Sequence, residues 1–338
     1  MFRTLLTHGT LTLLLLGLVS GAAYAQKPKI KLNPTQTLLL YPEGQSSDKG
    51  LEGAEGPLGS NGLTEPEILK ENGNLYNTGD SARIDLYIPK KCNGQMVIVC
   101  PGGGYHFTST YNEGLYVAKW MMAKGIAACV VKYRMPNGHW ELPLQDVQNA
   151  FRYCRANAAK WKVRQIGVIG FSAGGHLAAT ASTMYKDSLT RPDFSILIYP
   201  VITFGAGTSH GGTRNNLIGR KEVWDNHELK VDDYRASMAR YESLVEWYSC
   251  QNRVTADTPP TFLALSENDR TVPIANSILY YEKLAENKVP AELHLFPVGG
   301  HGWGFSKNEY RGDGKPDALA AHRQAFEKCL SDWLDSIK

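Results

Sequence analysis

The stretch Ile166–His176 reads IGVIGFSAGGH, and it indicates the fold more directly than any other segment of the chain. Its first half interleaves Ile166, Val168 and Ile169 with glycine, a pattern typical of a short buried strand in an α/β sheet. Its second half spells G-x-S-x-G and runs on into LAATA, which favours a helix. A strand, a sharp turn that carries Ser172 and a helix together predict a nucleophile elbow.

The G-x-S-x-G pattern is a weak signal by itself. The chain has 33 glycines among 338 residues, and such a composition produces the pattern by chance in roughly one chain in five or six. A plain Gly/Ser turn is therefore an alternative. In an elbow the flanking glycines have a physical reason, because a Cβ beside Ser172 would clash with neighbouring backbone. The remaining residues of a catalytic site must follow in order for the elbow to hold.

Strand and helix patterns alternate on both sides of this stretch. Such alternation predicts an α/β fold with a mostly parallel central sheet and helices on both faces. The expected strands cover residues 82–88, 96–100, 127–133, 165–170, 194–199, 261–265 and 291–296, and the expected helices cover 113–124, 144–161, 274–286 and 317–337.

The first 25 residues are typical of a signal peptide. Arg3 supplies the positive charge, Leu11–Val19 the apolar run, and Ala23-Tyr24-Ala25 the cleavage site. The apolar run is short for a membrane span, and no cysteine follows the cleavage site, so no membrane anchor is expected. We therefore expect an exported protein, periplasmic or secreted.

Three further regions follow the leader. Residues 26–79 are rich in Gly, Pro, Asn and Glu, and we expect an extended N-terminal arm packed on the main domain. Residues 80–338 carry the alternating pattern and form that domain. The alternation breaks at 201–260, where we expect an insertion that acts as a cap over the site, with a surface excursion as the alternative.

Composition and charge exclude several function classes. The net charge is +3 without a basic run, so no nucleic-acid partner is expected. Six cysteines allow fifteen full pairings, and Cys100 and Cys129 lie in apolar strand patterns that favour buried free thiols. No C-x-x-C and no histidine pair with metal-ligand spacing occurs, so no metal is expected. The oligomeric state stays open.

A serine nucleophile needs a base, and the base needs a carboxylate that orients it. Near the C-terminus, His294 falls inside an expected strand and His322 inside an expected helix. His301 instead lies on a glycine-rich loop after the last strand, where it has the freedom to face Ser172. His301 is therefore the predicted base, with an ordinary loop histidine as the alternative.

Asp269 is the predicted acid. It lies on the loop SENDRTVP that follows strand 261–265, just before the helix that Pro273 begins. Glu267 leaves the same strand two residues earlier and is the second candidate. Either carboxylate has a simpler alternative role as a partner of the helix dipole.

An oxyanion hole requires backbone N–H groups aimed at the developing negative charge. Ala173, directly after the nucleophile, is predicted to supply one. The loop PGGGY at 101–105 follows a buried strand, and its glycines allow a close approach, so Gly103 or Gly104 is predicted to supply the other. Strand, glycine-rich loop, elbow, acid and base thus occur in the required order, and the joint signal is strong.

The motifs GFSAGGHLA, PGGGY, DRTVP and GGHGWG together resemble the α/β-hydrolase superfamily, and within it the secreted bacterial BD-FAE-like esterases, a group that contains acetyl xylan esterases. The resemblance runs from Tyr41 to the C-terminus. It implies an α/β-hydrolase catalytic domain that needs no cofactor and removes acetyl groups from xylan or xylo-oligosaccharides. One departure is that Pro101 stands where related esterases often have the histidine of His-Gly-Gly, so the hydrogen bonds of that histidine are missing.

The residue roles that the resemblance implies agree with those reached above. They are Ser172 as nucleophile, Asp269 as acid, His301 as base, and Gly103 or Gly104 with Ala173 as oxyanion donors. Candidate substrate contacts are Tyr105, His106, His139 and Trp303, each with an ordinary packing role as the alternative. His176, one helical turn after the serine, is expected to be structural.

Three other functions stay open at this point. A feruloyl or general short-chain carboxylesterase would use the same three residues. A prolyl-oligopeptidase-type peptidase shares the fold but carries a propeller of several hundred residues ahead of it, where this chain has only residues 26–79. A non-catalytic glycan-binding protein would not need all three candidate residues.

Overall fold

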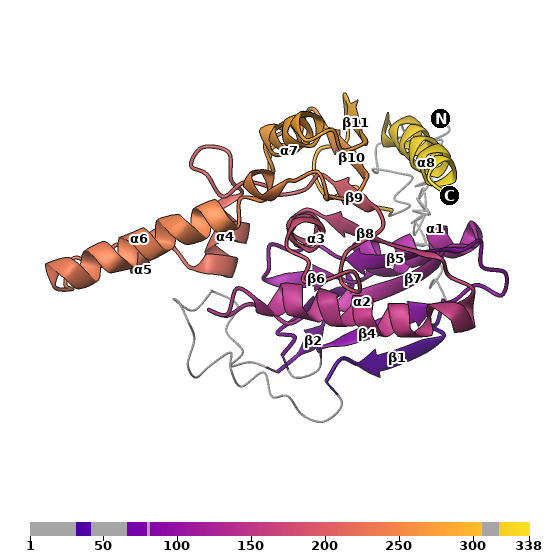
Figure 1. Cartoon of the computed structure of the whole chain (residues 1–338), viewed down its shortest axis with the longest axis horizontal. Helices are drawn as coiled ribbons and strands as arrows, with labels where there is room; N and C mark the ends of the chain where they lie inside the picture. The colour runs from indigo at the N-terminus through magenta and orange to yellow at the C-terminus, as the bar shows by residue number, and fades with distance from the viewer. Residues whose placement is uncertain (1–31, 42–65, 80–81, 306–317) are drawn as a thin grey trace, which may run out of the picture. The chain divides into compact units, whose positions relative to one another are not determined.

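Strand β8, Gln165–Phe171, lies in the middle of an eight-stranded sheet in the computed structural model (Figure 1). The structure describes residues 32–41, 66–79, 82–305 and 318–338. The expected signal peptide and most of the expected arm lie outside these residues.

Hydrophobic strands build this sheet, and β5 is buried along its whole length because neighbours cover both faces. The order is β1-β4-β7-β5-β8-β9-β10-β11. Strands β7, β5, β8, β9, β10 and β11 all run parallel, and β4 is antiparallel to both of its neighbours. The bounds are β1 Gln36–Leu39, β4 Arg83–Tyr87, β5 Gln95–Cys100, β7 Ala127–Lys132, β9 Ser195–Ile198, β10 Thr261–Ser266 and β11 Ala291–Phe296.

Helices cover both faces of the sheet. Alternate residues of β10 show this, because side chains along a strand point to opposite faces. Leu263 belongs to the core cluster that α2, α3 and α7 share with the sheet. Its neighbour Phe262 packs instead against Phe326 and Trp333 of α8, with ring centroids 6.5 and 5.5 Å away. The helices are α1 Tyr116–Ala123, α2 Leu142–Trp161, α3 Ala173–Thr183, α7 Ala275–Glu286 and α8 Ala318–Ser336.

These elements confirm the expected α/β-hydrolase fold with a mostly parallel central sheet. The helix expected at 113–124 begins differently, because a π-helical turn, η2, spans Tyr111–Leu115 before α1. That wider turn buries Glu113 and Gly114.

The region expected as an arm adds strands to the fold on both sides of its undescribed part. Strand β1 pairs with β4 at the edge of the main sheet, so the fold of the main domain extends N-terminal to residue 80. A second sheet has three strands in the order β2-β3-β6. They are β2 Ile68–Leu69, β3 Asn74–Tyr76 and β6 Phe107–Ser109.

The segment 201–260 holds helices α4 Gly211–Ile218, α5 Lys221–Trp224 and α6 Val231–Trp247, and the short 3-10 turn η3 Cys250–Arg253. Figure 1 shows α6 extending away from the sheet rather than over the elbow. Only the beginning of this segment borders the candidate site, through α4 and the residue that caps it.

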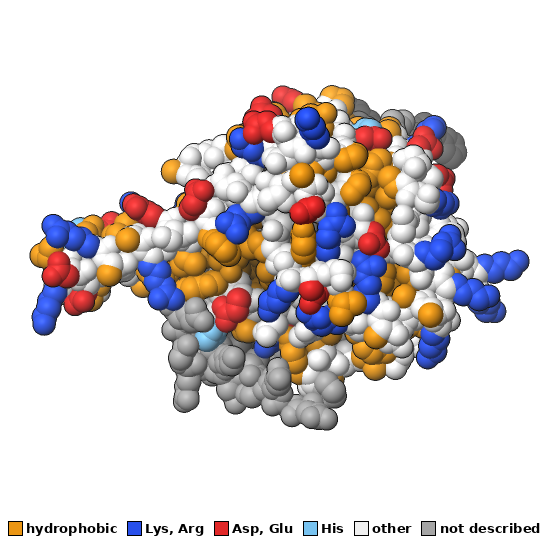
Figure 2. All heavy atoms as spheres, in the orientation of Figure 1, with side chains coloured by type: hydrophobic (Ala, Val, Ile, Leu, Met, Phe, Trp, Pro, Cys, Tyr) orange, Lys and Arg blue, Asp and Glu red, His pale blue; other side chains and the backbone are white. Residues whose placement is uncertain are grey.

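The described surface carries no single-sign patch on the face seen in Figure 2, where basic and acidic side chains are interspersed. All six cysteines are free thiols, four of them buried. In the described ranges, no helix is both long and apolar enough to span a bilayer.

Candidate active site

The turn between β8 and α3 holds Ser172 in a backbone conformation that residues other than glycine rarely adopt, with φ 53° and ψ −119°. Such a conformation costs on the order of 1–3 kcal/mol and needs support from its surroundings. A Cβ on Gly170 would lie 2.1 Å from the carbonyl oxygen of Gly174, and one on Gly174 would lie 2.1 Å from that of Cys100. Glycine at both positions therefore lets β8, the start of α3 and the neighbouring strand β5 approach closely enough to form the elbow.

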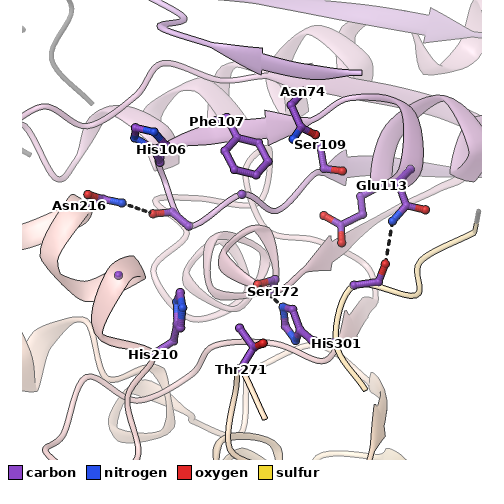
Figure 3. A pocket seen from close by; sticks show the side chains of 15 residues that line it. Asn74, His106, Phe107, Ser109, Glu113, Ser172, His210, Asn216, Thr271 and His301 are labelled. Atoms are coloured by element: carbon purple, nitrogen blue, oxygen red, sulfur yellow. Dashed lines mark hydrogen bonds between the residues drawn. The ribbon is translucent and has the colours of Figure 1, made fainter. Parts of the chain in front are cut away.

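Three side chains from three separate loops meet at this turn. The Nε2 atom of His301 lies 2.8 Å from the Oγ of Ser172 (Figure 3). The Nδ1 atom of the same ring lies 2.7 Å from Oδ2 of Asp269. A carboxylate only accepts, so Nδ1 carries the proton and Nε2 is left to accept from the serine hydroxyl. The structure thus brings together the three residues that the sequence indicated.

The Asp269 carboxylate is fixed by further hydrogen bonds. Its Oδ1 accepts from the backbone N–H groups of Thr271 and Val272, at 2.8 and 3.0 Å. Burial alone would raise the pKa of Asp269, but the hydrogen bonds with His301 and these amides bring that pKa below its usual value. Because its pKa is lowered, Asp269 stays ionised beside the imidazole. Glu267, the second candidate, has an exposed side chain.

The amides predicted for the oxyanion hole are available. Gly103 and Gly104 line the pocket with φ of 132° and 65°, and Ala173 begins α3. Within the described ranges, the N–H groups of all three donate to no other group. The amide of Gly102 is different, because it donates to the carboxylate of Glu113 at 2.7 Å. The glycine loop therefore keeps its second and third amides free for a ligand.

The pocket above Ser172 has a volume of about 550 Å³. Its walls come from the small sheet with its β3 and β6, the glycine loop, the turn η2, the α4 region, and the loops that carry the three meeting side chains (Figure 3). Of the described residues that line it, none is Lys or Arg, and Phe107 is the one purely apolar side chain larger than glycine. The polar lining residues are Asn74, His106, Ser109, Asn112, Glu113, Ser172, His210, Asn216, Thr271 and His301.

The structure places three predicted substrate contacts elsewhere. Tyr105 has φ 56°, and this backbone turn directs its ring into the core, where 1% of the residue is exposed. His139 is buried just before α2 and lies 4.0 Å from the carboxylate of Glu141. Trp303 packs against Tyr199 and other aromatic rings of the core. None of these three lines the pocket, whereas His106, named with them, does.

His176 is a buried structural residue, as its position in the helix indicated. Its Nε2 lies 2.8 Å from the carbonyl oxygen of Tyr248, so Nε2 carries the proton. Its Nδ1 then accepts from the hydroxyl of Tyr105 at 2.9 Å. Burial lowers the pKa of His176 from 6.5 to about 4, and the ring stacks on Phe204.

This histidine predicts an acid-sensitive stability. Because its folded-state pKa is depressed, the unfolded chain binds more protons between pH 6.5 and about 4, and the free energy of unfolding falls as the pH drops through that window. The contribution of His176 is on the order of 3 kcal/mol. Urea unfolding at neutral and acid pH should show a steeper loss for the wild type than for His176→Asn. Equal slopes would contradict this assignment.

Several residues that line the pocket were not among the site residues predicted from the sequence. His210 is the clearest case: it caps α4, and its Nδ1 accepts from the N–H of Thr213 at 3.2 Å, which leaves the proton on Nε2. Burial and then the nearby charge of His301 lower the pKa of His210. Asn216, on the same helix, donates to the carbonyl oxygen of Gly104 at 2.8 Å. No local sequence pattern singled out these two residues. The other lining residues that were not predicted are Asn74, Phe107, Ser109, Asn112, Glu113, Gly212, Thr271 and Gly302.

The described part of the chain holds no group of three or more His, Cys, Asp or Glu side chains that could bind a metal ion. The chemistry that this geometry supports is nucleophilic: a hydroxyl beside an imidazole, a carboxylate behind the imidazole, and free glycine amides in the wall of the same pocket.

The amino-acid sequence is similar to those of two proteins of known name. An acetylxylan esterase of Xylanibacter ruminicola is 35% identical over 268 residues, which cover 78% of this chain and 50% of that protein. An endo-1,4-beta-xylanase B of Butyrivibrio fibrisolvens is 31% identical over 230 residues, covering 63% of this chain and 33% of that protein. The chain thus spans half or less of these curated relatives.

The crystal structure of an acetyl ester-xyloside bifunctional hydrolase from Caldicellulosiruptor lactoaceticus superposes with a TM-score of 0.61 at 33% identity, covering 76% of this chain and 88% of that one. Residues 84–284, more than half of the chain, match the BD-FAE family. This match includes the elbow and Asp269 and ends before His301. The chain therefore belongs to the BD-FAE family of the α/β-hydrolase superfamily.

Proposed function

We propose that this protein is an exported serine carboxylesterase that removes acetyl groups from xylan or xylo-oligosaccharides. The observation that carries the proposal is the connected arrangement of Ser172, His301 and Asp269, with distances of 2.8 and 2.7 Å, at the base of a polar pocket. The relative named as an acetylxylan esterase supports the choice of substrate. Export rests on the leader pattern of the first 25 residues.

The geometry supports a two-step mechanism. His301 Nε2 takes the proton of Ser172 as Oγ attacks the ester carbonyl carbon, and the carbonyl electrons move to an oxygen that the amides of Ala173 and the Gly103–Gly104 loop hold. The bond to the sugar oxygen then breaks, and that oxygen takes the proton from His301. Ser172 is left acetylated. Water attacks next, gives its proton to His301, and acetate leaves as Ser172 recovers its proton.

The composition of the pocket favours a small acyl group on a neutral, hydroxylated alcohol. Sugars present hydroxyls that Asn, Ser, Thr and His side chains recognise by hydrogen bonds, and those residue types dominate the lining. A feruloyl group is a flat aromatic acyl chain and needs a broad apolar slot. Phe107 is the one large apolar side chain that the described lining offers. Acetyl is therefore the better match.

Parallel assays on native acetylated xylan, a feruloylated arabinoxylan and p-nitrophenyl acetate test the proposal. We expect acetate release from xylan, with a kcat/KM for the acetylated xylan at least about tenfold above that for the feruloylated arabinoxylan. We expect no acetate release by Ser172→Ala. Faster ferulate release would replace the substrate with the feruloyl alternative. Turnover of p-nitrophenyl acetate without acetate release from xylan would leave a general short-chain esterase.

A further inference from the structure

The π-helical turn η2 places two adjacent polar side chains between the loops that the reaction uses. Glu113 is buried, and its two carboxylate oxygens have different partners. Oε2 accepts from the N–H of Gly102, at 2.7 Å, at the start of the oxyanion loop. Oε1 accepts from the hydroxyl of Tyr199 at 2.9 Å. Single-turn π segments are often found at functional sites, and here the turn carries a carboxylate to the back of the pocket.

Tyr199 extends this contact to the loop of the base. Its hydroxyl accepts from the N–H of Gly304 at 2.9 Å, while it donates to Glu113. Its ring lies against the imidazole of His301, with centroids 4.8 Å apart. A continuous chain of hydrogen bonds therefore runs from Gly102 through Glu113 and Tyr199 to the loop that follows His301.

Asn112 supports the same loop from the neighbouring position. Its amide nitrogen donates to the carbonyl oxygen of Gly302 at 2.9 Å. Gly302 has φ 73° and Gly304 has φ 41°, conformations that glycine adopts freely, so contacts from outside the loop restrict its position. The turn η2 thus holds Gly302 and Gly102 directly, and it holds Gly304 through the hydroxyl of Tyr199.

The geometry points to Glu113 as a positioning residue: we propose that its carboxylate, through Tyr199, ties the oxyanion loop to the loop of His301 and so fixes the oxyanion amides relative to the base. This inference rests on the proposed esterase function. Pro101 stands at the first position of the loop, where related esterases often have a histidine that makes hydrogen bonds. Glu113 instead holds the loop from outside, through its contact with Gly102.

Loss of the Glu113 contacts should raise the free energy of the transition state more than that of the bound substrate. The negative charge on the carbonyl oxygen develops only as Ser172 attacks, so misplaced amides weaken the transition state more than the bound substrate. A misplacement of about 1 Å can lower the rate by about a hundredfold. A role in folding alone would change the melting temperature and leave the rate constants of the folded enzyme unchanged.

Glu113→Gln is the sharpest variant. It keeps the shape of the side chain but replaces one acceptor oxygen with an NH₂ donor, while both partners, the N–H of Gly102 and the O–H of Tyr199, are donors. One of the two contacts must fail. Tyr199→Phe removes only the hydroxyl and leaves the contact with Gly102. Tyr280→Phe is the matched control, because Tyr280 is also fully buried and its hydroxyl has no partner among the described residues.

The measurements are kcat and KM for p-nitrophenyl acetate, and the inhibition constant of phenylboronic acid, which forms a tetrahedral adduct with an active serine. For Glu113→Gln we expect kcat to fall about a hundredfold at nearly constant KM, and boronate affinity to fall with it. For Tyr199→Phe we expect about a tenfold loss of both, in line with one weakened hydrogen bond. Tyr280→Phe should match the wild type.

A folded Glu113→Gln enzyme with wild-type kcat and boronate affinity overturns the proposal, whatever its melting temperature. If that variant does not fold, Tyr199→Phe decides alone: reduced kcat with reduced boronate affinity supports the proposal, and unchanged values overturn it. Failure of the proposed function looks different, because Ser172→Ala would then keep its activity and the wild type would not bind the boronic acid.

Discussion

Ser172→Ala is expected to lower kcat for p-nitrophenyl acetate by about a million-fold, the scale of loss when a serine nucleophile is removed. The hydroxyl lies 2.8 Å from His301 Nε2, in the same pocket as the amides of Gly103 and Gly104, and is thus placed to attack a carbonyl carbon whose oxygen those amides hold. Without it no acyl-enzyme forms, and the remaining amides and pocket contacts give only a small acceleration over water.

The fold should survive this change. Ser172 is 8% exposed and its backbone is held by hydrogen bonds that do not involve the side chain: its N–H donates to Ile198, and its carbonyl accepts from Val201. The melting temperature of Ser172→Ala should therefore stay near that of the wild type, and retained turnover in a folded variant would exclude this residue as the nucleophile.

Asp269→Asn is expected to lower kcat by about 10⁴-fold through the tautomer of His301. The asparagine oxygen can keep accepting from the amides of Thr271 and Val272, which turns its NH₂ group toward Nδ1. Nδ1 must then accept, the ring proton moves to Nε2, and Nε2 no longer accepts the proton of Ser172.

Glu267→Gln provides the control for this prediction. It is the same kind of change two residues away on the same loop, at an exposed side chain. Steady-state kinetics should show wild-type kcat for Glu267→Gln beside the large loss for Asp269→Asn. The reverse order would make Glu267 the acid.

The sheet could be predicted from the sequence because its central strands are continuous apolar runs bounded by turns, such as Met96–Cys100 and Ile166–Phe171. The strands that the sequence did not indicate are short or at edges. Strand β2 has two residues and β3 has three, too few for a periodic pattern, and β1 is largely exposed. Their pairing depends on residues distant in the chain, which local patterns do not report.

The three residues that meet at the site could be predicted from the sequence for a similar reason. Ser172, Asp269 and His301 each follow a recognisable strand, so topology alone brings them to one edge of the sheet. The supporting residues carry no such signal. Glu113 reads as an ordinary acidic residue in the first turn of a helix, and only the π-helical turn buries it between two loops.

Three predicted substrate contacts do not line the pocket, because a local pattern does not report where a side chain points. Position along a loop indicates nearness to the pocket but not the direction of a side chain. Tyr105 follows the glycine loop directly, yet its positive φ turns the ring into the core, while Trp303 is two residues from His301 and packs behind it. His210 and Asn216 reach the pocket because α4 folds back onto the glycine loop, which no local pattern predicts.

Covalent labelling of the wild-type protein with a fluorophosphonate, followed by peptide mass spectrometry, tests whether Ser172 is the nucleophile. We expect one adduct per chain, on the peptide that contains Ser172. We also expect esterase activity to disappear in proportion to labelling, and no adduct on Ser172→Ala. Labelling at a different residue that abolishes activity, or full activity with Ser172 labelled, would contradict that role.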